Sequence, residues 1–257
     1  MSRPGRKPGR RPAVPPVARD RLRPQRSSNA APRGPVPAGA SGSASRPQPA
    51  LHLVVLAGPN GAGKTTFFDT FLAPTGIRFV NADRIAARIR PADPGSVAYD
   101  AARRADRERR KLVADRVPFC METVFSDPAG DKLAFLRGAQ AAGYAIDLVF
   151  IGLESIELSM ARVMQRIDSG GHDVPDDRLV ARYPRTLVNL RDALPWVDRA
   201  VLLDNSSADR PYRHVGTVQA GRIVARGKPM PDWARQVLEP LPGWFRVVRG
   251  SAPRAKP

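Results

Sequence analysis

The residues best suited to chemistry lie in one glycine-rich segment, GPNGAGKTT, which spans residues 58–66. Gly58 is followed by four residues and then by Gly63-Lys64-Thr65, which is the spacing of a phosphate-binding P-loop. In such a loop, backbone N–H groups turn towards phosphates, the lysine reaches the β and γ phosphates, and the threonine hydroxyl ligates Mg²⁺. ATP and Mg²⁺ are therefore the expected cofactors. The predicted nucleotide-binding residues are Gly58, Pro59, Asn60, Gly61, Ala62, Gly63, Lys64, Thr65 and Thr66, with Thr65 as the metal ligand.

A P-loop alone does not select the reaction. A transporter-type ATPase would need an LSGGQ-like signature before an apolar run ending in Asp, and the sequence contains no such segment. A P-loop kinase needs an acid that orients an acceptor hydroxyl, and arginines that balance the charge on the transferred phosphoryl group. The rest of the sequence supplies candidates for both.

Two acidic side chains lie near the carboxyl ends of predicted strands, where open α/β sheets bind their ligands. Asp83, in the segment RFVNADRI, could accept the proton of an acceptor hydroxyl, or it could cap the helix over residues 84–90. Glu122, in PFCMETVFS, interrupts an apolar run, where a carboxylate is costly unless it is paired or used. We interpret Glu122 as a substrate-hydroxyl ligand, with a buried ion pair as the alternative. Thr123 alternates to the opposite face and is a weaker substrate-binding candidate.

Two sets of arginines follow on consecutive predicted helices, and within each set the spacing places the side chains on one helix face. Between the helices lies SGGHDVPDD, a glycine pair followed by a turn. We interpret the two helices as a lid that closes over ATP and excludes water, with solvated helix faces as the alternative. The arginines are Arg162 and Arg166 on the first helix, and Arg178, Arg182 and Arg185 on the second.

The segments that must position these residues alternate between short apolar runs and longer helical periods, which is typical of a parallel sheet with helices on both faces. The predicted fold class is α/β, a three-layer P-loop NTPase fold with a mostly parallel sheet and a helical lid. Helices are expected between Asp127 and Gly143 and between Ser155 and Gly170, and the arginine-rich run 103–111 is expected to be an exposed helix face. Strands are expected at 51–57, 77–80, 119–125, 144–153 and 200–203, followed by a hairpin over 215–224 and a helix over 231–241.

Composition divides the 257 residues into a basic tail and a body. Residues 1–50 hold 11 of the 27 prolines and carry 11 Lys and Arg against one acid, so most of the net charge of +18 lies there. Such a segment cannot bury enough apolar surface to offset the entropy of ordering. We predict a disordered basic tail at 1–49, a kinase domain at 50–241 and a flexible C-terminal tail at 242–257. The N-terminal tail could bind nucleic acid or another anionic surface, or it could simply be solvated.

Several classes of protein are excluded by composition. Hydrophobic residues make up 42% of the chain, which is incompatible with global disorder of the body. The sequence has neither the run of roughly 20 apolar residues needed for a membrane helix nor a secretory signal, so we expect a cytoplasmic protein with no membrane partner. The single cysteine excludes an intramolecular disulfide, and the three histidines are too scattered for a zinc motif, so we expect no structural metal cluster.

In this order and spacing, the segments GPNGAGKTT, VNADRIA, METVFS and ARVMQRIDSGGHDVPDDRLVARYPRTLVNL resemble the zeta-toxin-like P-loop kinases. The resemblance covers about residues 51–205, and GGHDVP is its most specific piece. It implies a kinase that uses Mg-ATP, whose acceptor in characterised zeta toxins is the 3′-hydroxyl of the sugar in UDP-N-acetylglucosamine. It is compatible with inhibition by a separate antitoxin protein. The residue roles that it implies are a general base at Asp83, nucleotide and Mg²⁺ binding at Lys64 and Thr65, a substrate ligand at Glu122, and phosphate clamps at Arg162 or Arg166 with Arg182 or Arg185.

The expected function is transfer of the γ-phosphoryl group of ATP to a hydroxyl of a small molecule, by resemblance UDP-N-acetylglucosamine. Two alternatives stay open. One is a P-loop phosphotransferase that acts on the hydroxyl of another metabolite or an antibiotic. The other is a nucleic-acid-associated ATPase in which the basic tail at 1–49 makes the contact.

Overall fold

A computed structural model of the chain describes residues 51–168 and 175–243. The expected N-terminal tail at 1–49, the GGHDV part of the expected lid and nearly all of the expected C-terminal tail lie outside the described residues. The description below concerns the unit that begins at Leu51.

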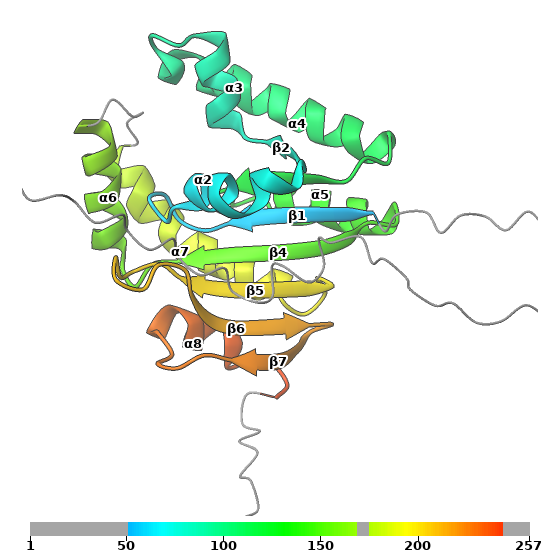
Figure 1. Cartoon of the computed structure of the whole chain (residues 1–257), viewed down its shortest axis with the longest axis vertical. Coiled ribbons are helices and arrows are strands. Elements are labelled where there is room, and N and C mark those ends of the chain that lie inside the picture. Colours follow the sequence, from blue (N-terminus) through cyan, green and yellow to red (C-terminus); the bar gives the residue numbers. More distant parts are fainter. Residues whose placement is uncertain (1–50, 169–174, 244–257) are drawn as a thin grey trace, which may run out of the picture. The chain divides into compact units, whose positions relative to one another are not determined.

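A single seven-stranded sheet with the strand order β2-β3-β1-β4-β5-β6-β7 forms the centre of this unit (Figure 1). The first five strands in this order are mutually parallel, and the last two pair in an antiparallel manner. The chain therefore has the mostly parallel α/β sheet of a P-loop NTPase, as the sequence predicts. The strands are β1 (His52–Ala57), β2 (Arg78–Val80), β3 (Phe119–Thr123), β4 (Ala145–Gly152), β5 (Arg199–Asp204), β6 (Arg213–Gln219) and β7 (Arg222–Arg226).

Helices cover both faces of the sheet and form the outer two layers. The helix after β1 continues as a π turn over Phe68–Leu72 and a 3-10 turn over Ala73–Thr75, and a further 3-10 turn spans Pro94–Val97. The α-helices are α2 (Lys64–Phe67), α3 (Ala82–Ile89), α4 (Ala98–Ala114), α5 (Asp131–Ala141), α6 (Ile156–Asp168), α7 (Asp176–Ala193) and α8 (Asp232–Leu238).

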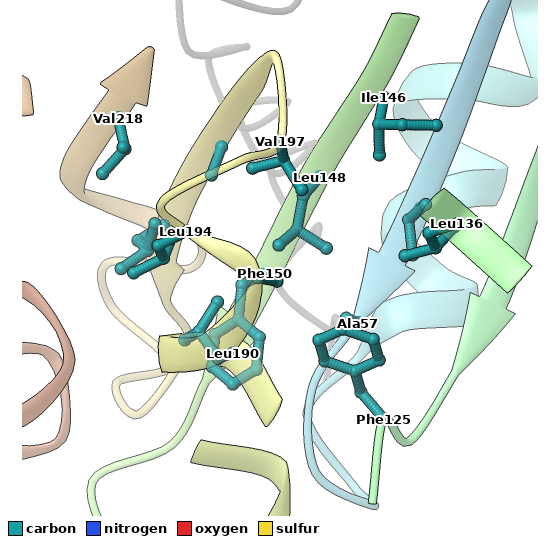
Figure 2. Close-up of a cluster of buried hydrophobic side chains, with 14 of the residues drawn as sticks. Ala57, Phe125, Leu136, Ile146, Leu148, Phe150, Leu190, Leu194, Val197 and Val218 are labelled. Atoms are coloured by element: carbon teal, nitrogen blue, oxygen red, sulfur yellow. The ribbon is translucent and has the colours of Figure 1, made fainter. Parts of the chain in front are cut away.

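Side-chain alternation along the strands divides the core into two clusters. On β1, Leu53, Val55 and Ala57 face the cluster packed by α4, α5, α7 and α8, whereas Val54 and Leu56 face the cluster packed by α2 and its continuation. Figure 2 shows the first cluster, in which side chains from β4 meet side chains from α7. Each large apolar side chain buried here contributes roughly 1.5–3 kcal/mol to folding. The sheet is thus a rigid base for the loops at the carboxyl ends of its strands.

The expected strands and the hairpin are confirmed, and the differences lie at element ends. The third strand ends at Thr123, before the expected Phe125, because Phe125 has a positive φ of 64° that leaves the extended conformation. The next helix begins at Asp131 after Gly130, and not near Asp127. In the hairpin turn, Ala220 and Gly221 both have positive φ, which is the conformation of a two-residue turn that matches strand twist.

The expectation of an exposed helix face over residues 103–111 is wrong for Ala105 and Arg109. Arg109 of α4 is only 5% exposed, because it points inward with Ala105 and Leu112. The neighbouring arginines are exposed, as expected. Among the described residues, no helix combines the length and the apolar character needed to cross a membrane.

Candidate active site

The P-loop connects β1 to α2 over residues 58–63, and glycine is required at its first and last positions. A Cβ atom on Gly58 would lie 2.1 Å from the carbonyl oxygen of Ile151, on the neighbouring strand β4. Gly63 has a positive φ of 86° and caps α2, and a Cβ there would lie 2.8 Å from the side-chain nitrogen of Asn205. Both positions exclude a side chain, so the loop passes closer to its neighbours than any other residue type would allow.

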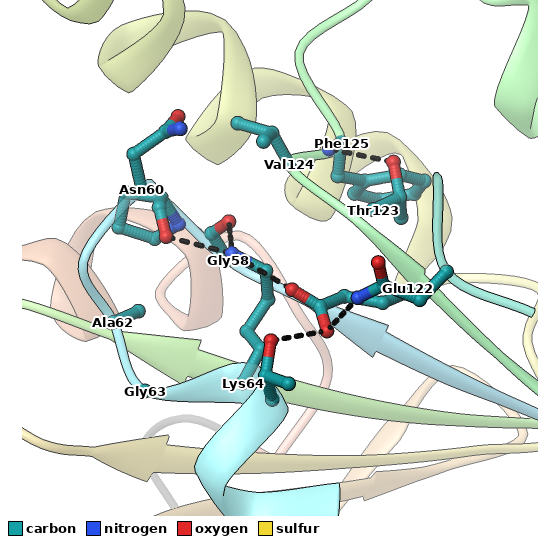
Figure 3. A network of polar contacts seen from close by, with 12 residues as sticks. Gly58, Asn60, Ala62, Gly63, Lys64, Glu122, Thr123, Val124 and Phe125 are labelled. Carbon is teal, nitrogen blue, oxygen red and sulfur yellow. Dashed lines mark hydrogen bonds and ion pairs between the residues drawn. The ribbon is translucent and has the colours of Figure 1, made fainter. Parts of the chain in front are cut away.

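The Lys64 side chain is buried in this loop, with 6% of its surface exposed. Its Nζ donates hydrogen bonds to the carbonyl oxygens of Gly58 and Pro59, both at 2.9 Å (Figure 3). Burial lowers the pKa of Lys64, the carboxylates of Glu122 and Asp83 act in the opposite direction, and Arg166 lowers it further. The ammonium is therefore hydrogen-bonded to the loop backbone, and two carboxylates and one arginine lie close enough to shift its pKa.

Glu122, near the end of β3, connects the P-loop to the second strand. Its Oε2 accepts hydrogen bonds from Thr65 Oγ1 at 2.8 Å and from Asn81 Nδ2 at 2.7 Å. Its Oε1 lies 3.9 Å from Lys64 Nζ (Figure 3). In this structure Glu122 thus forms the ion pair that the sequence left as an alternative, while it also lines the cavity described below.

The donor set at Thr65 and Glu122 fits Mg²⁺. This cation takes oxygen ligands and is usually bound by one or two protein groups together with substrate phosphates and water. A hydroxyl and a carboxylate lie 2.8 Å apart beside the phosphate loop. Within 51–168 and 175–243, no group of three or more His, Cys, Asp or Glu side chains is placed to hold a metal ion.

Asp83 lies in the first turn of α3, but it does not cap that helix. The cap is Asn81, whose side chain accepts the backbone N–H of Arg84 at 2.9 Å. Asn81 is a buried residue that also donates to Glu122, and sequence reasoning passed over it although it stands directly after the second strand. The capping role is thus filled by Asn81, and Asp83 is one of the residues that line the cavity described below.

A cavity of about 630 Å³ lies between α3, α4, the segment after β3 and the first half of α7. This volume is within the range of roughly 300–1,000 Å³ that is usual for small-molecule sites. The cavity is lined by many polar side chains and contacts none of the P-loop glycines. Its lining includes the predicted site residues Asp83, Glu122, Thr123, Arg182 and Arg185.

Thr123 has a local structural contact in addition to its place on the cavity wall. Its Oγ1 accepts the backbone N–H of Phe125 at 2.9 Å, where the chain turns out of the strand (Figure 3). Helix α7 is fastened to the same turn, since Thr186 Oγ1 donates to the carbonyl of Val124 and Asn189 Nδ2 donates to that of Phe125. These bonds fasten α7 to the segment that follows β3.

The two arginine sets occupy different places. Arg182 of α7 is partly buried on the cavity wall, and its pKa is lowered by burial and by Arg178 and Arg185 but raised by Asp83. Arg162 and Arg166 of α6 are not among the described residues that line the cavity. Arg166 lowers the pKa of Lys64. Arg162 Nη2 donates a hydrogen bond to the carbonyl of Ser206 at 3.3 Å. The α6 set thus belongs to the P-loop side, and the α7 set to the cavity side.

Further contacts around the P-loop come from residues that the sequence did not single out. Ser159 of α6 donates its hydroxyl to the carbonyl of Asn60 at 2.7 Å. Asn205 Nδ2 donates to the carbonyl of Ala62 at 2.9 Å, and Tyr212 Oη donates to that of Gly63 at 2.9 Å. Carbonyls held outward in this way leave the loop's N–H groups for phosphates. No local motif marks these residues, because each lies about 100 or more positions from its partner.

Comparison with known proteins agrees with this geometry. The family model described as AAA domain matches residues 53–182. An uncharacterised protein of Haemophilus influenzae is 29% identical over 126 residues, which are 49% of this chain and 88% of the relative.

Two solved structures share the fold at 18% sequence identity. A chain from the PezAT chromosomal toxin–antitoxin system of Streptococcus pneumoniae gives a TM-score of 0.50, over 65% of this chain and 70% of that one. The AvrRxo1-ORF1:-ORF2 complex with ATP gives a TM-score of 0.52, over 68% of this chain and 60% of that one. The expected resemblance to zeta-toxin-like P-loop kinases is confirmed at the level of the fold.

Proposed function

The chain belongs to the AAA domain family, and from this premise we propose that it is an ATP-dependent phosphotransferase that acts on a hydroxyl of a small molecule. The observation that carries the proposal is the position of Glu122. Its carboxylate contacts Lys64 and Thr65 of the P-loop and also lines the cavity that holds Asp83. A phosphate site and a polar cavity of substrate size therefore meet at one side chain, which is the arrangement that transfer between two substrates requires.

In the proposed reaction, the acceptor hydroxyl lies in the cavity beside Asp83. The acceptor oxygen forms a bond to the γ-phosphorus, the bond from this phosphorus to the β–γ bridging oxygen breaks, and ADP leaves. The hydroxyl proton passes to the Asp83 carboxylate. Lys64, Arg166 and Arg182 supply positive charge to the phosphoryl oxygens. When bound at Thr65 and Glu122, Mg²⁺ would neutralise charge on the β and γ phosphates.

The test is ATP-dependent phosphorylation by purified protein, followed by mass spectrometry. By resemblance to the zeta toxins we propose UDP-N-acetylglucosamine as the first acceptor, within a panel of nucleotide sugars and other hydroxyl compounds. A product heavier by one phosphate, formed by the wild type and absent with Lys64→Ala, is the expected result. ATP binding without a phosphorylated product from any acceptor would argue against a phosphotransferase.

The base assignment is tested by Asp83→Asn, which removes the proton acceptor but preserves shape. We expect ATP affinity to stay within about twofold and transfer to fall by about 10²-fold or more, which is the usual contribution of a general base. Asp115→Asn is the matched control, because Asp115 is 45% exposed and pairs with Lys111 on the outer surface. If Asp83→Asn retained full activity, Asp83 would not be the base.

A further inference from the structure

Part of the cavity wall is formed by α4 and α5, away from the residues assigned above to phosphoryl transfer. We call Asp106, Arg109 and Lys132 the α4–α5 wall; all three line the cavity. Arg109 and Lys132 both donate to the same oxygen, Asp106 Oδ1, and the lysine does so at 3.2 Å. One carboxylate oxygen therefore serves two cations.

Arg109 is an unusual residue for a helix that is otherwise rich in exposed charge. Its side chain is only 7% exposed, and burial lowers the pKa of its guanidinium while Asp106 acts in the opposite direction. A guanidinium carries five N–H donors. Among the described residues, the only oxygen hydrogen-bonded to Arg109 is Asp106 Oδ1, so this cavity-lining cation has further donors that a ligand in the cavity could use.

A further acid, Asp127, lies next to this wall without forming an ion pair with its cations. Asp127 also lines the cavity, but its Oδ2 accepts the backbone N–H of Lys132 at 3.2 Å. Within the described part of the chain, Asp127 forms no ion pair with Arg109 or Lys132. The three residues of the α4–α5 wall thus hold two cations that share one carboxylate oxygen.

We propose that the α4–α5 wall binds an acidic group of the acceptor, a carboxylate or a phosphate, while the acceptor hydroxyl lies beside Asp83. This inference rests on the proposed function, and it adds a substrate class: hydroxyl compounds that carry an acid. Arginine and lysine donors match both kinds of acid, and the planar arginine fork can bind two oxygens at once. The acid of the ligand takes the donors that Asp106 leaves unsatisfied.

The experiment compares neutral and acidic acceptors that share a hydroxyl. Glycerol is paired with glycerate to test a carboxylate, and N-acetylglucosamine is paired with its 1-phosphate to test a phosphate. Binding to the full-length protein is measured by calorimetry in the presence of ADP and Mg²⁺, and phosphorylation with ATP is measured separately. Because binding needs no turnover, tighter binding of an acidic probe supports this inference even when that probe is not phosphorylated, whereas the proposed function fails only if no acceptor of the wider panel is phosphorylated.

The variant is Lys132→Gln, since this side chain is 23% exposed and its loss leaves Arg109 paired with Asp106. We expect the preference for the acidic member to fall by about tenfold, as for loss of one charge-assisted hydrogen bond, and Lys132→Arg to restore it. Lys111→Gln is the matched control, because Lys111 lies on α4 but is 74% exposed and outside the cavity.

Two results would overturn the inference. The first is that no acidic probe binds more tightly than its neutral partner in the wild type. The second is that Lys132→Gln retains the preference while it binds ADP normally. A preference confined to one pair identifies the acid as carboxylate or phosphate.

Discussion

Replacing Glu122 by Gln tests whether the carboxylate between the P-loop and the cavity supports catalysis. Glu122 Oε1 lies 3.9 Å from Lys64 Nζ, and the two side chains are 12% and 6% exposed. At an effective dielectric constant of about 20, two unit charges about 4 Å apart attract each other by about 4 kcal/mol. Lys64 keeps its bonds to the carbonyls of Gly58 and Pro59, and Asp83 still supports its charge, so only part of this attraction is lost.

The same substitution weakens two hydrogen bonds. The donors Thr65 Oγ1 and Asn81 Nδ2 bind a charged oxygen at 2.8 and 2.7 Å, and bonds to a neutral amide are about half as strong. We take the combined loss in the transition state as about 3 kcal/mol, which corresponds to a fall in kcat of roughly 100-fold. The fold should persist, because the glutamine keeps the size of the side chain and can still accept one or both hydrogen bonds.

The assay is the initial rate of phosphoryl transfer at saturating ATP and acceptor, titrated with Mg²⁺. Glu108→Gln is the matched control: Glu108 pairs with Arg78 on the surface, where the two side chains are 32% and 57% exposed, and such pairs contribute little. The control should stay within about twofold of wild type. A Glu122→Gln protein with kcat within about threefold of wild type and an unchanged Mg²⁺ requirement would refute this reasoning.

Two further predictions concern the P-loop and the dependence of stability on pH. Gly58→Ala should weaken ATP binding by at least about tenfold in calorimetry, because its Cβ would lie 2.1 Å from the Ile151 carbonyl. Gly76→Ala, at a positive φ of 75° with nothing within 4 Å, should instead cost only about 1–2 kcal/mol of stability and spare ATP affinity. Burial, aided by Arg199, lowers the pKa of His214, so the unfolded state binds more protons and stability should fall as pH drops below about 6.5. Denaturant unfolding between pH 7 and 5 should show a smaller fall for His214→Gln; equal slopes for both proteins would contradict the assignment.

The sequence was sufficient for features that are determined locally. The strand at β1 could be predicted because a buried parallel strand is a nearly continuous apolar run, and the loop after it because its glycine spacing is physically required. The hairpin could also be predicted locally, because the pair Ala220-Gly221 falls between two apolar segments. The predicted end of β3 was wrong because a single residue changes the local conformation: Phe125 has a positive φ, and the strand ends before it.

The candidate site was predicted less completely, because its contacts are formed between distant segments. Arg109 looks like its exposed neighbours in sequence, and only the packing of α4 against the sheet makes it a buried cavity residue. Tyr212 and Asn205 contact the P-loop from the segment that joins β5 to β6, which no pattern in either segment indicates. Helix capping by Asn81 instead of Asp83 could have been anticipated, since asparagine is as strong a cap as aspartate and stands at the strand end.

The strand order explains why one glutamate can fill two roles that the sequence presented as alternatives. Strand β3 lies between β2 and β1, with Glu122 in register with Leu56 of β1. A side chain at this position reaches Thr65, in the first turn of the helix that follows β1, and Asn81, which follows β2. An ion pair with Lys64 and a place on the cavity wall are therefore compatible, because both follow from the central position of β3. Any substitution that moves this carboxylate should therefore weaken the binding of both nucleotide and acceptor. Substitutions of Asp83 and Lys132, which lie on other elements of the cavity wall, should affect only the acceptor side of the reaction.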